Sequence, residues 1–184
     1  EAFARTQFGP GYERLTNPEP LWVLLVWHRS RGDSMLVERI ADSLVVRSER
    51  LGDPRSRIFA QAARAHVALV RHDTATAISR LERLPSPGRQ GEFGWRFGDA
   101  LPVERLMLAR LLLDQGRYRE SILAASVFDH YEPIMFLPFV AQSLRWRYEA
   151  ALALGARGAA DSFRRRLERL GRHDLVGAAD NNRR

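Results

Sequence analysis

The stretch that decides the fold is LPVERLMLARLLLDQGRYRESILAASVFDHYEP, residues 101–133. Its first half carries apolar residues at helical spacing, and Gly116 then interrupts the pattern. A second helical run begins at Tyr118 and ends before Pro133, because proline cannot continue a helix. The stretch therefore predicts two short helices joined by a tight turn. Their apolar positions are Leu106, Leu108, Ala109, Leu112 and Leu113, then Ile122, Ala125 and Phe128.

The same pattern recurs along the rest of the chain. Runs with helical spacing alternate with Gly, Pro and capping residues, which predicts an all-α fold built from helical hairpins. Small residues recur at matching points, since Ala65 and Ala77 stand where the quoted stretch has Ala109 and Ser121. We expect an irregular lead-in over 1–17, hairpins at about 20–51, 55–84, 102–130 and 139–170, a loop over 85–101, and a fraying tail over 171–184.

A small residue in the first helix, Gly116 at the turn, the nearby Tyr118 and the closing Pro133 together resemble a degenerate tetratricopeptide (TPR) repeat of bacterial type. The resemblance implies a right-handed α-solenoid of about four hairpins over residues 18–170. It also implies a concave groove lined by the first helix of each hairpin. A generic helical bundle or another α-solenoid would produce a similar pattern, and both alternatives stay open.

Two residue types are missing, and their absence excludes several kinds of chemistry. The chain has no cysteine, which rules out thiol nucleophiles, thiolate zinc sites and disulfides. All 29 basic residues are arginine, which rules out Schiff-base chemistry and the lysine of a phosphate-binding P-loop. The five histidines are scattered and lack metal-ligand spacing. We therefore expect no enzyme activity, no cofactor and no metal site.

The net charge of +7 raises the question of nucleic-acid binding. The basic excess is spread over both halves of the chain, with one cluster in the last predicted helix. That cluster is either the solvated outer face of a terminal helix or a patch for phosphates or an acidic partner. Its members are Arg164, Arg165, Arg166 and Arg169.

The loop over 85–101 alternates glycines with Phe93, Trp95 and Phe97. It lacks the strand and the lysine that a nucleotide-binding loop would need. We expect an ordered apolar flap over the groove between the second and third hairpins. The alternative is that these aromatic residues, together with neighbouring arginines, stack on a ligand or a partner.

The TPR resemblance implies a non-catalytic scaffold that binds a peptide or partner protein in its groove, as part of a larger signalling or regulatory protein. Arg110 and Arg145 would be charged anchors for an acidic peptide. The alternative is a nucleic-acid-associated protein that uses the basic last helix. The implied groove residues are Trp22, Arg29, Phe59 and His66 from the first two hairpins, and Arg110, Gln142, Arg145 and Glu149 from the last two.

Compartment and oligomeric state are less constrained. The longest apolar run, residues 21–27, is too short to span a membrane, and no signal peptide is visible. The chain begins with Glu1, which suggests a processed chain or a piece of a longer one. We expect a cytoplasmic protein, with an extracytoplasmic domain of a membrane-anchored protein as the alternative. The apolar connector over 134–139 is either core or an exposed interface between subunits.

Overall fold

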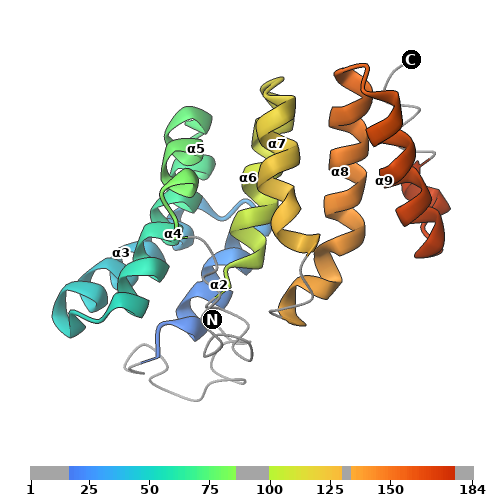
Figure 1. The fold of residues 1–184 in the computed structure, drawn as a ribbon. Coiled ribbons are helices and arrows are strands. Elements are labelled where there is room, and N and C mark those ends of the chain that lie inside the picture. The colour runs from blue at the N-terminus through green and yellow to red at the C-terminus, as the bar shows by residue number, and fades with distance from the viewer. Residues whose placement is uncertain (1–16, 86–99, 130–133, 177–184) are drawn as a thin grey trace. The chain divides into compact units, whose positions relative to one another are not determined.

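The computed structural model describes residues 17–85, 100–129 and 134–176. These residues form helices and their connections, with no strand among them, which confirms the predicted all-α class (Figure 1). The chain divides into two compact units, Glu1–Gly88 and Arg89–Arg184, called unit 1 and unit 2 below. The division falls inside the loop predicted over 85–101.

The described residues of unit 1 form two helix pairs. Neighbouring helices pack on each other along the chain, and α2 also contacts α4. Proline and aspartate define where the second pair begins, because the Asp53 carboxylate accepts a hydrogen bond from Ser56 N at 2.9 Å and Pro54 starts the helix. The helices are α2 (Glu19–Ser30), α3 (Ser34–Leu51), α4 (Pro54–Val70) and α5 (Thr74–Glu82).

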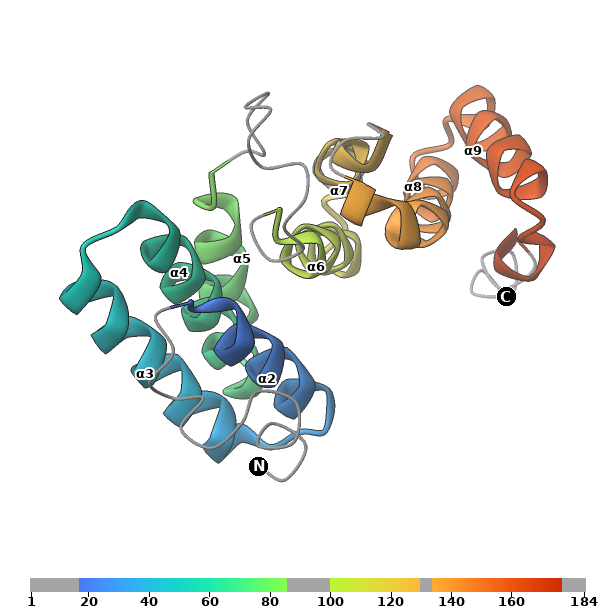
Figure 2. The same ribbon diagram turned by 90° about the horizontal axis from the view of Figure 1, so that it is seen from below.

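Unit 2 repeats this arrangement with longer connections. Its helices alternate in direction, so α6 and α8 run parallel and contact each other while α7 and α9 return (Figures 1 and 2). Two short 3₁₀ segments join the pairs. The elements are α6 (Pro102–Asp114), α7 (Tyr118–Ala125), η2 (Ser126–Asp129), η3 (Ile134–Phe139), α8 (Val140–Ala153) and α9 (Arg157–Arg169).

One turn geometry joins the two helices of every pair in the described residues. The turn residue has a left-handed backbone, and the next N–H donates back to a carbonyl of the first helix. In unit 2, Arg117 N donates to Leu112 O at 2.9 Å, and in unit 1 Asp73 N donates to Ala68 O at 2.9 Å. This bond ends the first helix and fixes the start of the second. The turn residues are Gly32, His72, Gly116 and Gly155, with φ between 60° and 73°.

Each turn sets the position of a buried contact between its two helices. The residue seven before the turn residue and the residue five after it are both buried at every one of these turns. In the pair α6–α7, Ser121 Oγ donates to Ala109 O at 2.7 Å across the contact. Most of these side chains are small, so the backbones approach closely. The eight residues are Leu25, Ala65, Ala109 and Tyr148, then Val37, Ala77, Ser121 and Ala160.

The connector over 134–139 is partly buried and partly exposed. Phe136 is 1% exposed and its ring packs on Phe128, with ring centroids 4.9 Å apart. Leu137 of the same segment is 54% exposed. Packing also extends past residue 170, where the sequence analysis expected fraying, because Leu175 is buried against Leu144 and Leu167.

The turn geometry predicts that His72→Gly stabilises the protein. His72 is exposed and has a φ of 60°, a conformation that costs a residue with a Cβ about 1 kcal/mol relative to glycine. We expect the free energy of unfolding, measured by urea denaturation, to rise by about 0.5–1 kcal/mol. An unchanged or lower value would contradict the left-handed turn at this position.

Gly116→Ala is the matched substitution, and it should lower the free energy of unfolding where His72→Gly raises it. A Cβ at Gly116 would lie 4.0 Å from the Tyr118 ring, which is an ordinary contact, so the backbone strain alone acts. We expect a loss of about 1 kcal/mol in the same urea experiment.

Candidate functional site

Four of the predicted groove residues lie on two neighbouring helices of unit 2. Arg110 lies on α6, and Gln142, Arg145 and Glu149 lie on the neighbouring helix α8. Their side chains are neither fully buried nor fully exposed. We call the surface formed by these four residues, together with Asp114 and Trp146, the α6–α8 face.

The charged residues of the α6–α8 face are bonded to one another. Arg110 Nε donates to Asp114 at 2.9 Å, and Arg145 Nε donates to Glu149 at 2.7 Å. Arg110 also forms an ion pair with Glu149 at 3.8 Å, which links the two helices. The Arg110 guanidinium lies 5.8 Å from the ring centroid of Trp146. Both predicted anchors are therefore already neutralised by carboxylates of the same face.

Unit 1 places its predicted groove residues differently. Trp22, Phe59 and His66 are at most 1% exposed, and the rings of Trp22 and Phe59 meet edge to face with centroids 5.9 Å apart. These three side chains belong to the core of unit 1 and are not offered at its surface. Arg29 is half-buried.

The four arginines of the predicted basic patch on α9 differ in their ion pairs. Arg164 pairs with Asp161 at 3.4 Å, and Arg166 turns back towards Asp129. Arg165 and Arg169 are exposed and, among the described residues, take part in no ion pair. They flank Glu168 in a shallow depression. The aromatic loop residues Phe93, Trp95 and Phe97 lie outside the described residues.

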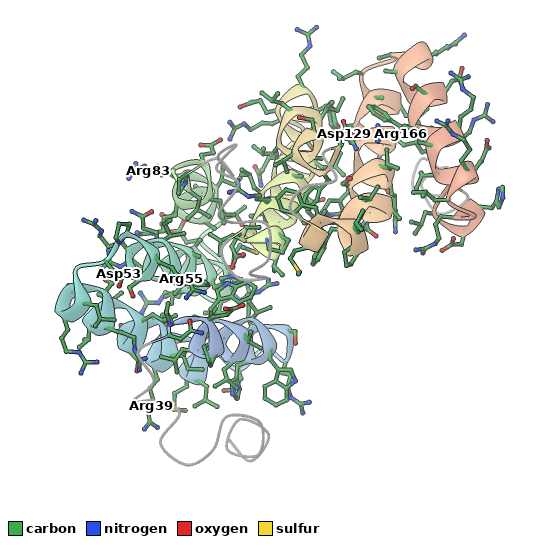
Figure 3. All side chains as sticks on the ribbon, turned by 60° about the horizontal axis from the view of Figure 1, so that its bottom comes forward. Arg39, Asp53, Arg55, Arg83, Asp129 and Arg166 are labelled. Atoms are coloured by element: carbon green, nitrogen blue, oxygen red, sulfur yellow. The ribbon has the colours of Figure 1, made fainter. Side chains whose placement is uncertain are left out.

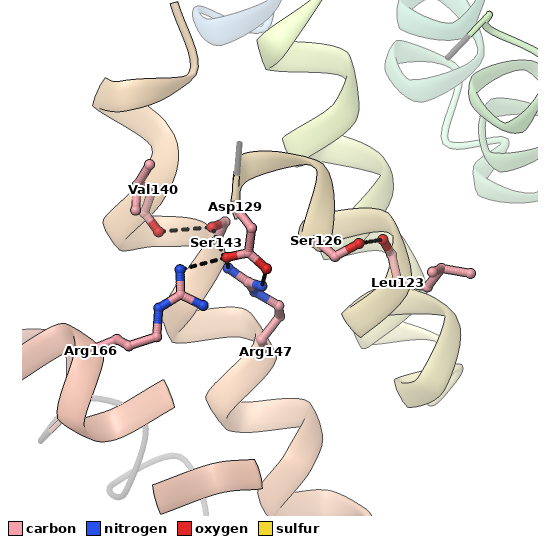
Figure 4. Close-up of polar contacts among 7 residues, drawn as sticks. All are labelled: Leu123, Ser126, Asp129, Val140, Ser143, Arg147 and Arg166. Atoms are coloured by element: carbon pink, nitrogen blue, oxygen red, sulfur yellow. Dashed lines mark hydrogen bonds and ion pairs between the residues drawn. The ribbon is translucent and has the colours of Figure 1, made fainter. Parts of the chain in front are cut away.

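Asp129 forms a polar centre in unit 2 that was not predicted from the sequence. This carboxylate at the end of η2 accepts two hydrogen bonds from Arg147 of α8, at 2.6 and 3.0 Å, and one from Arg166 of α9, at 2.5 Å (Figure 4). Figure 3 shows the places of Asp129 and Arg166 in the molecule. Arg147 is 1% exposed and its guanidinium lies 5.1 Å from the ring centroid of Phe163. One carboxylate thus ties η2 to both helices of the last pair.

An arginine on the apolar side of α8 explains why an acidic side chain is needed at Asp129. Leu144, Tyr148 and Ala151 form the buried stripe of this helix, and Arg147 falls between them at helical spacing. A charged residue on such a stripe needs a partner, because burying an unpaired charge is costly. That position was the signal in the sequence for an acidic residue nearby.

Asp129 is held ionised by its partners. Burial opposes ionisation and would raise the pKa of this carboxyl, but hydrogen bonds from Arg147 and Arg166, with the attraction of the two positive charges, outweigh it. The pKa of Asp129 therefore lies below its ordinary value.

Neither a metal centre nor a membrane span is present among the described residues. Across 17–85, 100–129 and 134–176, no three His, Asp or Glu side chains gather closely enough to hold a metal ion. Over the same ranges, no helix combines the length and the apolar character needed to cross a bilayer.

Comparison with protein-family models, curated proteins and solved structures finds no match to this chain.

Removing the Asp129 carboxylate should destabilise unit 2. In Asp129→Ala the buried Arg147 loses its ion-pair partner, which costs about 3–5 kcal/mol when both groups are buried. Because the Asp129 side chain is 36% exposed, we expect about 2–3 kcal/mol. Urea denaturation measures the loss. Asp161→Ala is the control, since Asp161 pairs with an exposed arginine and should cost less than about 0.5 kcal/mol.

The same carboxylate predicts a pH dependence. A group whose pKa is lowered by folding stabilises the folded state above its unfolded pKa of about 3.9, and this stabilisation is lost as the pH falls through the folded pKa. The difference in unfolding free energy between the natural chain and Asp129→Asn should therefore shrink from pH 6 towards pH 2. A difference that stays constant with pH would contradict the ionised carboxylate.

Proposed function

We propose that this chain is a non-catalytic protein–protein interaction module that binds a peptide or a partner protein on the first helices of its hairpins. The α6–α8 face carries the proposal. It combines Trp146, two arginines and two carboxylates on neighbouring parallel helices. Tryptophan and arginine are the residues that most often dominate binding energy at protein interfaces.

The internal pairing of this face also supports binding. Arg110 and Arg145 are each held by a carboxylate one helical turn away, so their long side chains have less freedom to lose when a partner docks. Half-buried side chains that are already ordered make a better docking surface than mobile ones. The face therefore offers a preformed patch with both apolar and hydrogen-bonding groups.

The proposed architecture is a right-handed α-solenoid of four TPR-like hairpins. It is supported by the repeated turn and by the contact between first helices within each unit, α2 with α4 and α6 with α8. In such a stack the first helices line one surface. The module would belong to a larger cytoplasmic signalling or regulatory protein.

The alternative is a nucleic-acid-associated protein that uses α9. Arg165 and Arg169 favour it, because they are exposed and form no ion pair among the described residues. Arg164 and Arg166 weaken it, because each is held by an aspartate of unit 2. Two available arginines on one helix are a small electrostatic footprint for a nucleic acid.

Affinity capture with two matched variants tests the proposal. The chain is used as bait beside Trp146→Ala, which alters the α6–α8 face, and the double variant Arg165→Ala with Arg169→Ala, which alters α9. We expect a protein partner whose capture falls at least tenfold with Trp146→Ala and is unchanged in the α9 variant. Circular dichroism confirms that each bait is folded.

The opposite pattern would favour the alternative. Capture of nucleic acid, lost in the α9 variant and falling steeply with salt, would contradict the proposed function. Capture of the same protein by all three baits would contradict the assignment of the α6–α8 face.

A further inference from the structure

We infer that the partner of the α6–α8 face is an extended segment carrying one basic and one acidic residue about four positions apart, rather than an acidic peptide. The inference rests on the proposed function and names the chemistry of its partner. It comes from the order of the charges on this face.

The four charges of the face alternate in sign along one path. Arg110 contacts Asp114 at 2.8 Å, and Arg145 contacts Glu149 at 2.7 Å. The contact of 3.8 Å between Arg110 and Glu149 joins the two pairs. The path therefore starts at the negative Asp114 and passes through the positive Arg110 and the negative Glu149. It ends at the positive Arg145, and the four charges sum to zero.

The two ends of this path differ from its middle. Arg110 and Glu149 each contact two opposite charges, whereas Asp114 and Arg145 each form one ion pair among the described residues. The Asp114 side chain is 47% exposed and the Arg145 side chain 21%. A partner thus meets a negative end at Asp114 and a positive end at Arg145.

An acidic peptide fits this arrangement poorly. A carboxylate that approaches Arg110 also meets the carboxylates of Asp114 and Glu149, which repel it. A partner with opposite charges in the matching order avoids this repulsion. Its basic group would lie at Asp114 and its acidic group at Arg145.

The helix geometry gives the spacing of the partner's two charges. Each Arg–carboxylate pair spans four residues of helix, which is about 6 Å along the axis. Because α6 and α8 run parallel and Arg110 lies beside Glu149, the two ends of the path are offset by about 12 Å along the helix axes. An extended chain covers this distance in about four residues. Trp146 lies beside Arg110, where an apolar side chain between the two charges would pack.

Three fluorescein-labelled peptides of equal length test the inference by fluorescence anisotropy. Their cores are Arg-Ala-Leu-Ala-Glu, Glu-Ala-Leu-Ala-Glu and Arg-Ala-Leu-Ala-Arg. We expect the mixed peptide to bind at least fivefold more tightly than either same-sign peptide. Equal affinity for all three, tighter binding of the all-acid peptide, or no binding of the mixed peptide would overturn the inference.

Charge swaps give a matched control for the order of charges. The double variant Arg145→Glu with Glu149→Arg keeps the net charge and the pair on α8, but it puts two positive charges side by side at Arg110. We expect this variant to lose the fivefold preference. Adding Arg110→Asp and Asp114→Arg restores the alternation in reverse, so the preference should return.

The failure of this inference is distinguishable from failure of the proposed function. If the α8 swap leaves the preference unchanged, the order of charges does not select the partner and the inference is wrong. The proposed function fails separately, when the chain captures nucleic acid and the α9 variant loses it.

Discussion

The left-handed residue at the turn of each helix pair is the constraint on which the fold depends. It ends the first helix, turns the chain and places the next N–H against a carbonyl four residues before the turn residue, as in Arg117 N to Leu112 O. With that bond in place, the residue seven before the turn and the residue five after it face each other in the core. Close packing of the two helices follows from one backbone geometry repeated along the chain.

The helices and their small buried contacts were predictable from sequence because both follow from periodicity and from Gly and Pro. The left-handed His72 was not, since only its place in the repeat reveals it. The groove residues were predicted from the resemblance alone. In the structure, the rotation of α2 and α4 about their own axes directs Trp22 and Phe59 into the core instead. Partners across helices, such as Asp129 with Arg147, depend on how the helices pack, which periodicity does not specify.

Unit 2 uses its arginines in two ways that the charge count does not distinguish. Arg147 and Arg166 converge on one carboxylate and hold the last helix pair to η2. Arg110 and Arg145 are instead interleaved with carboxylates on a half-exposed face beside Trp146. The first arrangement stabilises the fold, while the second forms the charge-balanced surface on which we propose that a partner binds. The net positive charge of the chain therefore says little about what it binds.

Amide hydrogen exchange measured by NMR tests the repeated turn most directly. The amides that follow the turn residues lie outside the helices, yet each donates to a helix carbonyl. We predict that the N–H groups of Asp33, Asp73, Arg117 and Ala156 exchange as slowly as amides inside the neighbouring helices. Exchange at the rate of an unstructured peptide at these positions would contradict the shared turn and the packing of the helix pairs that follows from it.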